Sequence, residues 1–232
     1  MHGELTKLKD VIEQVNLRDD DTLVFLGDYI DRGLDSCGVV DYIIKLSESY
    51  KVITLKGNHE MLLSESKAFI EGKLSLEPMV ASWVMNGGYQ CIDSYSRRYI
   101  PTKGLSDEEL KFELGQVSIV DSIDMIYGRH GDFFDNLQLT YETDEYIFVH
   151  GYLDHELPSN KQNEMSCLWN RFDQIKPHMS GKRVVCGHTI QRDGPRENDH
   201  AICIDTGSFL SNGYITAMII DGDTITYKSS KL

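Results

Sequence analysis

The chain has 232 residues, of which 37 are acidic and 23 are basic, so its formal net charge at pH 7 is -14. A protein with this negative charge is repelled by nucleic acid and by anionic membrane surfaces. No run in the sequence approaches the ~20 apolar residues of a membrane span. We therefore expect a cytoplasmic protein whose partner is neither nucleic acid nor a membrane. The five cysteines form no C-x-x-C pair, which favours a reducing compartment over a disulfide framework.

The chain opens with a pattern of helix, strand, helix and strand. Apolar residues recur at helical spacing from Glu4 to Val15, and the apolar run at 23–26 predicts a buried strand. Ser36 is the expected cap of a helix that leads to a second strand at 52–55. This order implies a right-handed crossover between two parallel strands.

The middle of the chain has a different pattern. Residues 61–144 are mostly helical in periodicity and include a capping box at 106–109. Strand signals return at 146–149, 183–186 and 201–204, and residues 214–220 and 224–227 are predicted to form the two strands of a hairpin. We predict one domain over residues 1–232, with a mostly helical insertion at about 61–144.

Four of the predicted strand ends carry a polar residue next to a glycine, namely Asp28, Asn58, His150 and His188, and His2 also precedes a glycine. Carboxyl ends of neighbouring strands meet in one crevice of an open α/β sheet. Imidazole, carboxylate and carboxamide groups suit manganese, iron or zinc. Two such ions bridged by Asp28 would clamp an in-line displacement and generate hydroxide near neutral pH.

Other polar residues near these strand ends suit phosphate chemistry. His59 with Asp31 forms a candidate proton donor, and Arg32 and Arg171 are candidate phosphate ligands. Each residue alone also has a structural explanation, such as a surface ion pair or an Asx-turn. The joint pattern favours the catalytic interpretation. Four further histidines do not follow a predicted strand next to a glycine and are expected at the surface: His130, His155, His178 and His200.

Several blocks of the sequence resemble a known family. GDYIDRG at 27–33, GNHE at 57–60, HG at 150–151 and GH at 187–188 resemble, in order, the signature blocks of the phosphoprotein phosphatase family of metallophosphoesterases. WVMNGG at 83–88, WNR at 169–171 and IDTG at 204–207 are similar to its bacterial and phage branch, typified by bacteriophage lambda protein phosphatase.

The resemblance implies a fold, a cofactor and residue roles. The fold would be the α/β metallophosphoesterase fold, a two-sheet β-sandwich flanked by helices, with two divalent metal ions that are usually manganese. The implied roles are His2 on the first metal, Asp28 as the bridge, Asn58, His150 and His188 on the second metal, His59 with Asp31 as the acid dyad, and Arg32, Arg171 and Asn58 on phosphate.

One feature departs from the family. Its opening block is Gly-Asp-x-His-Gly after an apolar strand, whereas this sequence begins Met1-His2-Gly3. The first strand and the aspartate of the first metal are therefore expected to be missing. We interpret Met1 as an internal methionine of a longer gene, and the alternative is a true divergence that lost the first metal site. Either interpretation predicts weak occupancy of the first metal site and low activity.

The leading functional hypothesis is a metal-dependent serine/threonine protein phosphatase, in which a metal-bridging hydroxide attacks a phosphorylated protein or peptide. A symmetrical bis(5'-nucleosyl)-tetraphosphatase has the same metal blocks and is the alternative enzyme. A third hypothesis, a phosphate-binding relative without catalysis, rests on the missing aspartate alone. The metal identity, the physiological substrate and the oligomeric state are left open by the sequence.

Overall fold

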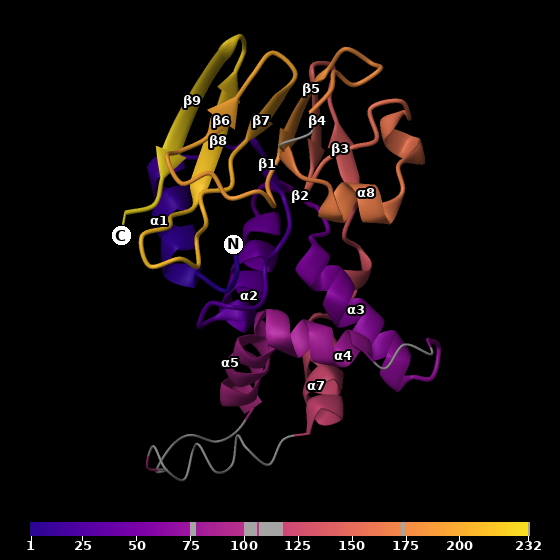
Figure 1. The fold of residues 1–232 in the computed structure, drawn as a ribbon. Helices are drawn as coiled ribbons and strands as arrows, with labels where there is room; N and C mark the ends of the chain where they lie inside the picture. Colours follow the sequence, from indigo (N-terminus) through magenta and orange to yellow (C-terminus); the bar gives the residue numbers. More distant parts are fainter. Residues whose placement is uncertain (75–77, 100–105, 107–117, 173–174, 232) are drawn as a thin grey trace.

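The computed structural model describes residues 1–74, 78–99, 106, 118–172 and 175–231. The described strands form three sheets with helices around them (Figure 1). β1 (Thr22–Phe25) and β2 (Lys51–Thr54) make a parallel pair. A second sheet has the order β3-β4-β5-β7-β6, and β8 with β9 makes an antiparallel hairpin. The α/β class is confirmed, and the described strands divide into three separate sheets where we expected two.

The unit β1-α2-β2 positions the first half of the site. α1 (Leu5–Val15) leads into β1, and α2 (Ser36–Ser47) connects β1 to β2. The two strands are parallel, as the sequence pattern predicted, and Thr22 lies opposite Lys51. Because the two strands run the same way, the loops that follow them begin at the same edge of the sheet.

The cap of α2 differs from the prediction. Asp35 is the N-cap, and its carboxylate accepts a hydrogen bond from Gly38 N at 2.9 Å. Ser36 is the first residue of the helix, and its Oγ instead accepts from Asp31 N at 3.0 Å. Asp35 is the better acceptor for the exposed N–H groups of the first turn because its carboxylate is charged.

Helices fill the segment after β2, and Figure 1 shows them gathered below the sheets. They are α3 (Asn58–Ile70), α4 (Pro78–Trp83), the π-helical turn η1 (Val84–Gly88), α5 (Tyr89–Tyr99) and α7 (Ile119–Asp135). β3 (Thr140–Glu142) falls within 61–144, the range that we expected to be mostly helical. The expected capping box at 106–109 lies, apart from Ser106, outside the described residues.

The five-stranded sheet positions the second half of the site. β4 (Tyr146–Val149), β5 (Arg183–Cys186) and β7 (Ala201–Cys203) are parallel neighbours, with β3 and β6 (Arg196–Glu197) antiparallel at the edges. The 3-10 turn η2 (Ser159–Lys161) and α8 (Glu164–Trp169) connect β4 to β5. The hairpin consists of β8 (Thr216–Asp221) and β9 (Thr224–Ser229).

The core divides into two clusters that match these two halves. One cluster joins α1, α2 and the helices after β2, and the other joins β4, β5, β7 and α8. All five cysteines are free and buried, in agreement with the prediction of no disulfide framework. Among the described residues, no helix combines the length and the apolar character needed to cross a membrane.

Candidate active site

The structure brings together four predicted metal ligands from four separate segments. His150 Nε2 lies 3.0 Å from Asn58 Oδ1 and 3.5 Å from Asp28 Oδ2. His188 Nδ1 lies 3.0 Å from Asn58 Oδ1 and 3.3 Å from His150 Nε2. Asp28 and Asn58 follow the paired strands β1 and β2, whereas His150 and His188 follow β4 and β5. The site therefore lies where the two sheets meet.

The hydrogen bonding of His150 indicates what this group can hold. Its Nδ1 lies 2.7 Å from Leu26 O, and a carbonyl oxygen only accepts, so Nδ1 carries the ring hydrogen. His150 Nε2 therefore presents a lone pair to the oxygens of Asn58 and Asp28. Of the two imidazoles, His188 can offer these oxygens at most one hydrogen, on Nδ1, and Asp28 Oδ1 also accepts from the backbone N–H of His59 at 3.2 Å. A divalent cation satisfies such a cluster of lone pairs, and the mixture of nitrogen and oxygen donors suits manganese, iron or zinc.

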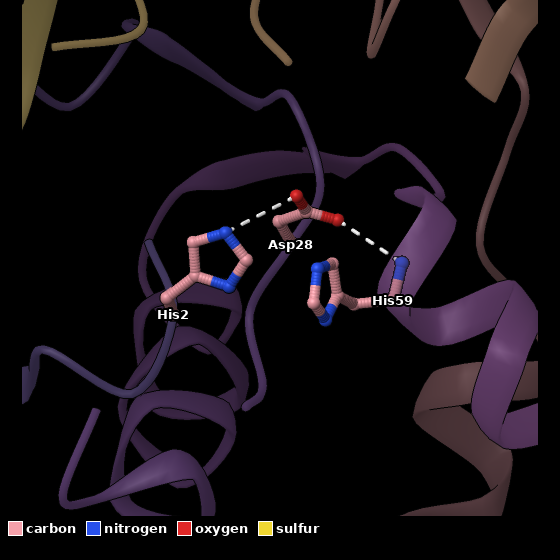
Figure 2. A group of neighbouring side chains, drawn as sticks. All are labelled: His2, Asp28 and His59. Carbon is pink, nitrogen blue, oxygen red and sulfur yellow. Dashed lines mark hydrogen bonds and ion pairs between the residues drawn. The ribbon is translucent and has the colours of Figure 1, made fainter. Parts of the chain in front are cut away.

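A second possible metal group shares the carboxylate of Asp28. His2, Asp28 and His59 each offer one ligand atom within 4.8 Å of the others, and Figure 2 shows both imidazoles next to the carboxylate of Asp28. His2 Nε2 is 3.3 Å from Asp28 Oδ2, and its Nδ1 is 3.0 Å from Ile30 O. The hydrogen bond to this carbonyl leaves a lone pair on His2 Nε2, which accepts from Arg32 Nη1 at 3.3 Å and is the atom that metal ligation would use.

The charges in this cluster favour ligation. Burial opposes ionisation of Asp28, but the neighbouring imidazoles, His150 foremost, hold its pKa well below the ordinary value. Burial lowers the pKa of His2 well below 6.5, and burial together with His150 lowers the pKa of His188 to about 4. The site thus contains one carboxylate and at least two neutral imidazoles, which are the protonation states that bind metals.

The predicted proton-donor dyad is formed by direct contact. His59 Nδ1 lies 2.6 Å from Asp31 Oδ2, and the indole N–H of Trp83 donates to the other carboxylate oxygen of Asp31 at 3.1 Å. Burial by itself lowers the pKa of His59, but the charge of Asp28 and the hydrogen bond with Asp31 outweigh burial and raise it. The geometry favours a protonated His59 whose ring is held in one orientation.

The two candidate phosphate ligands differ in their surroundings. Arg32 donates to His2 Nε2 and, through Nε, to Asn86 O, each at 3.3 Å, and its guanidinium lies 4.3 Å from the ring centroid of Phe209. These contacts place Arg32 beside the metal cluster. Arg171 is exposed, and its charge helps to lower the pKa of His188.

The backbone of the site is strained. Five non-glycine residues there have positive φ: His2, Asp28, Asp31, Arg32 and His188, with values between 48° and 71°. Outside the site, Asn16, at the end of α1, is the one described non-glycine residue with positive φ. Conformations of this kind persist where surrounding contacts impose them, and they cluster at active sites.

Glu60 is a functional residue that sequence reasoning missed. It is buried, and its carboxylate accepts from the backbone N–H groups of Asp28, Tyr29, Ile30 and Gly57, at 2.8 to 3.3 Å. Burial raises the pKa of Glu60 to about 7, and the charge of Asp28 adds to this. Glu60 therefore joins the loops after β1 and β2. Its position at the third residue of α3, typical of a capping box, was the available signal.

Two of the four histidines expected at the surface are buried. His130 Nδ1 contacts Tyr95 Oη at 2.6 Å, and its Nε2 contacts Asp41 at 3.1 Å. His178 contacts Ser180 Oγ and a main-chain carbonyl. The prediction was wrong for these two because both ring nitrogens of each have polar partners, all of them distant in sequence except Ser180 beside His178.

Over most of its length this chain resembles known proteins. The family profile described as calcineurin-like phosphoesterase (Metallophos) matches residues 1–201. An asymmetrical bis(5'-nucleosyl)-tetraphosphatase, PrpE, of Anoxybacillus flavithermus (strain DSM 21510 / WK1) is 25% identical over 201 residues, which are 84% of this chain and 74% of that protein.

Solved structures share the fold at lower identity. The cold-active protein tyrosine phosphatase of a psychrophilic Shewanella species has a TM-score of 0.61 at 13% identity, covering 99% of this chain and 78% of that one. A candidate diadenosine tetraphosphatase has a TM-score of 0.57 at 19% identity, covering 99% and 90%. These likenesses confirm the expected metallophosphoesterase fold. The narrower prediction of a phosphoprotein phosphatase stays a prediction.

Proposed function

Because the matching profile covers most of its length, this chain belongs to the calcineurin-like phosphoesterase family, and we propose that it is a divalent-metal-dependent hydrolase of bis(5'-nucleosyl) tetraphosphates. The observation that carries the proposal is the convergence of two ligand groups on Asp28. When bound there, divalent cations polarise phosphate and lower the pKa of a coordinated water. The remaining roles fall to side chains of the chain itself.

Of the residues around Asp28, His2, Asn58, His150 and His188 would hold the metal, and His59, protonated in its contact with Asp31, would not. Four residues, Arg32, Arg171, His59 and Asp31, would act on the substrate or position the group that does. Arg32 and Arg171 supply planar guanidinium groups, each of which can bind two phosphate oxygens at once. His59 gives a proton to the departing oxygen, while Asp31 holds its ring through Nδ1. Water adds to phosphorus and gives up one proton to solvent, the bond between phosphorus and the leaving oxygen breaks, and the proton from His59 goes to that oxygen.

A dinucleotide substrate is supported by the named relative and by one feature of the surface. The relative that shares 25% identity is a bis(5'-nucleosyl)-tetraphosphatase. Trp169 is 37% exposed, and its ring lies edge-on to His188, with centroids 5.9 Å apart. An exposed indole next to the metal cluster offers a face on which a base can stack. Serine/threonine phosphatase activity is the second candidate, favoured by the resemblance of the motif blocks.

A direct comparison of substrates tests the proposal. The purified chain is incubated with excess Mn²⁺ and either diadenosine tetraphosphate or a phosphoserine peptide, and the products are separated by anion exchange. We expect faster turnover of the dinucleotide. ADP alone would indicate symmetrical cleavage, and ATP with AMP asymmetrical cleavage. Release of phosphate from the peptide with an intact dinucleotide would favour the second candidate, and no turnover of either would contradict both.

A further inference from the structure

Arg32 is held at three points by other parts of the chain. Its backbone N–H donates to Gly87 O at 3.1 Å, and its Nε–H donates to Asn86 O at 3.3 Å. Beyond these bonds, the guanidinium carbon lies 4.3 Å from the ring centroid of Phe209. A free arginine side chain samples many rotamers, so contacts at the backbone, at Nε and at the guanidinium face limit Arg32 to few of them.

The outer end of the Arg32 guanidinium keeps donors for a ligand. Among the residues that the structure describes, none accepts a hydrogen bond from Nη2. Nη1 contacts His2 Nε2 at 3.3 Å, but a metal bound by His2 would take the same lone pair. Nη1 and Nη2 together form the planar fork that binds two oxygens of a phosphate group. The contacts with Asn86 O and with Phe209 leave this fork free.

Phe209 lies on a loop that is tied to α1. Lys7 Nζ of α1 donates to Ser208 O at 2.6 Å and to Gly213 O at 2.7 Å, so main-chain carbonyls on both sides of Phe209 are fixed. The ring of Phe209 also stands edge-on to His2, with centroids 4.9 Å apart and planes at 86°. Phe209 therefore has a fixed place next to a candidate metal ligand.

The turn η1 fits against Arg32 so closely that only glycine suits residue 87. Gly87 has a φ of 111°, and a Cβ atom there would lie 2.6 Å from Arg32 Cγ and 2.8 Å from Arg32 N. Trp83, the residue before η1, donates to Asp31 Oδ1 at 3.1 Å. Asp31 and Arg32 have positive φ values of 71° and 64°, a conformation that surrounding contacts must impose. The turn and Trp83 together hold both residues.

We propose that Phe209 is a positioning residue, which together with the carbonyl groups of η1 fixes the guanidinium of Arg32 for binding a substrate phosphate. The ring face attracts the cation, and Asn86 O sets the direction of Nε. Pre-organisation of this kind lowers the entropy that is lost when phosphate binds. This role of Phe209 rests on the phosphate chemistry proposed above, but not on the identity of the group that the phosphate carries.

The order of the Arg32 side chain is measured first, on the chain loaded with diamagnetic Zn²⁺. Phe209→Leu keeps an apolar side chain and removes the ring face, whereas Phe209→Tyr keeps the face. We expect Phe209→Leu to lower the order parameter of the Arg32 Nε–H group, measured by ¹⁵N relaxation. The proton signal of this group should also shift, because the ring current is lost. Phe209→Tyr should retain both values.

Calorimetric titration of inorganic phosphate into the Mn²⁺-loaded chain tests whether this order serves a ligand. We expect Phe209→Leu to raise the Kd for phosphate about two- to fivefold, the effect of one cation–π contact. Arg32→Ala should raise this Kd at least about tenfold. In the Arg32→Ala background, Phe209→Leu should cause no further change, because its effect passes through Arg32. The Kd for Mn²⁺ should stay within about twofold in Phe209→Leu.

Two matched controls separate this role from general damage to the fold. Phe69→Leu changes a half-buried ring of α3, about 16 Å along the helix from Asn58, and should leave the Kd for phosphate unchanged. Gly87→Ala places a Cβ atom against Arg32 and should raise this Kd at least about fivefold. Gly128→Ala, on α7, has open space where its Cβ atom would lie and should leave the Kd unchanged.

Three results would overturn the proposal. An unchanged order parameter of Arg32 in Phe209→Leu would show that the ring does not fix the guanidinium. An equal loss of phosphate affinity in the Arg32→Ala background would show that Phe209 acts through another residue. Failure of the wild type to bind phosphate would remove the ligand for which Arg32 is held. If these measurements come out as expected and the dinucleotide is not hydrolysed, the proposed hydrolase activity is refuted and the role of Phe209 stands.

Discussion

Replacing Glu60 with glutamine tests whether this buried carboxylate holds the two catalytic loops together. Glu60 Oε2 accepts from Asp28 N at 2.9 Å and Gly57 N at 3.0 Å, and Oε1 accepts from Tyr29 N at 2.8 Å and Ile30 N at 3.3 Å. Glu60→Gln keeps the size of the side chain and turns one of these oxygens into an NH₂ group. Whichever oxygen is replaced, two buried N–H groups then face a donor.

The expected cost follows from these two groups. A buried donor left without a partner costs about 1–3 kcal/mol, so Glu60→Gln should destabilise the chain by about 2–6 kcal/mol. This cost is a large fraction of the free energy of unfolding of a whole protein, which is typically about 5–15 kcal/mol. Because Glu60 fixes the backbone N–H of Asp28, turnover should also fall in the molecules that stay folded.

Urea unfolding measures the loss of stability. It is carried out at pH 8 because Glu60, with a pKa of about 7, is then ionised in the wild type. Glu13→Gln, an exposed change on α1, is the matched control and should shift stability by no more than about 0.5 kcal/mol. A loss below about 1 kcal/mol for Glu60→Gln would refute the assigned role of these hydrogen bonds.

Four further changes test other parts of the site and the core. His59→Asn should lower kcat on a phosphoserine peptide by about 10²–10⁴ but much less on 4-nitrophenyl phosphate, whose leaving group needs no proton. Trp83→Phe removes the indole N–H bonded to Asp31 and should lower kcat with little change in KM, since the His59 ring is then less firmly held. Chelation with EDTA should abolish turnover and lower Tm. Adding Mn²⁺ at about 100 times its Kd should raise the free energy of unfolding by about 2.7 kcal/mol, which calorimetry measures. Burial lowers the pKa of His130 below its ordinary 6.5. The unfolded chain therefore binds this proton more readily than the folded chain, and stability should fall as the pH drops below about 6.5. His130→Gln should make the decrease in Tm between pH 8 and pH 5 smaller.

Strand ends and the residues just after them were predictable because their signals are local. An apolar run followed by glycine and a polar residue marks the end of a buried strand wherever it packs, so Asp28, Asn58, His150 and His188 were identified without knowledge of the fold. The helix at 5–15 and the strands at 146–149 and 183–186 were likewise visible in periodicity alone. The cap of α2 was misplaced by one residue because Asp35 and Ser36 are both good caps.

Contacts between segments far apart in the chain were decided by tertiary packing alone. Nothing near His150 in sequence indicates that Leu26 O orients its ring, and nothing near Asp31 indicates Trp83. Burial of His130 depends on Tyr95 and on a carboxylate that packing brings to it. The open edges of β1 and β8 are likewise a property of how the sheets assemble, because a strand's own sequence sets its alternation of faces but not which neighbour, if any, completes its hydrogen bonds.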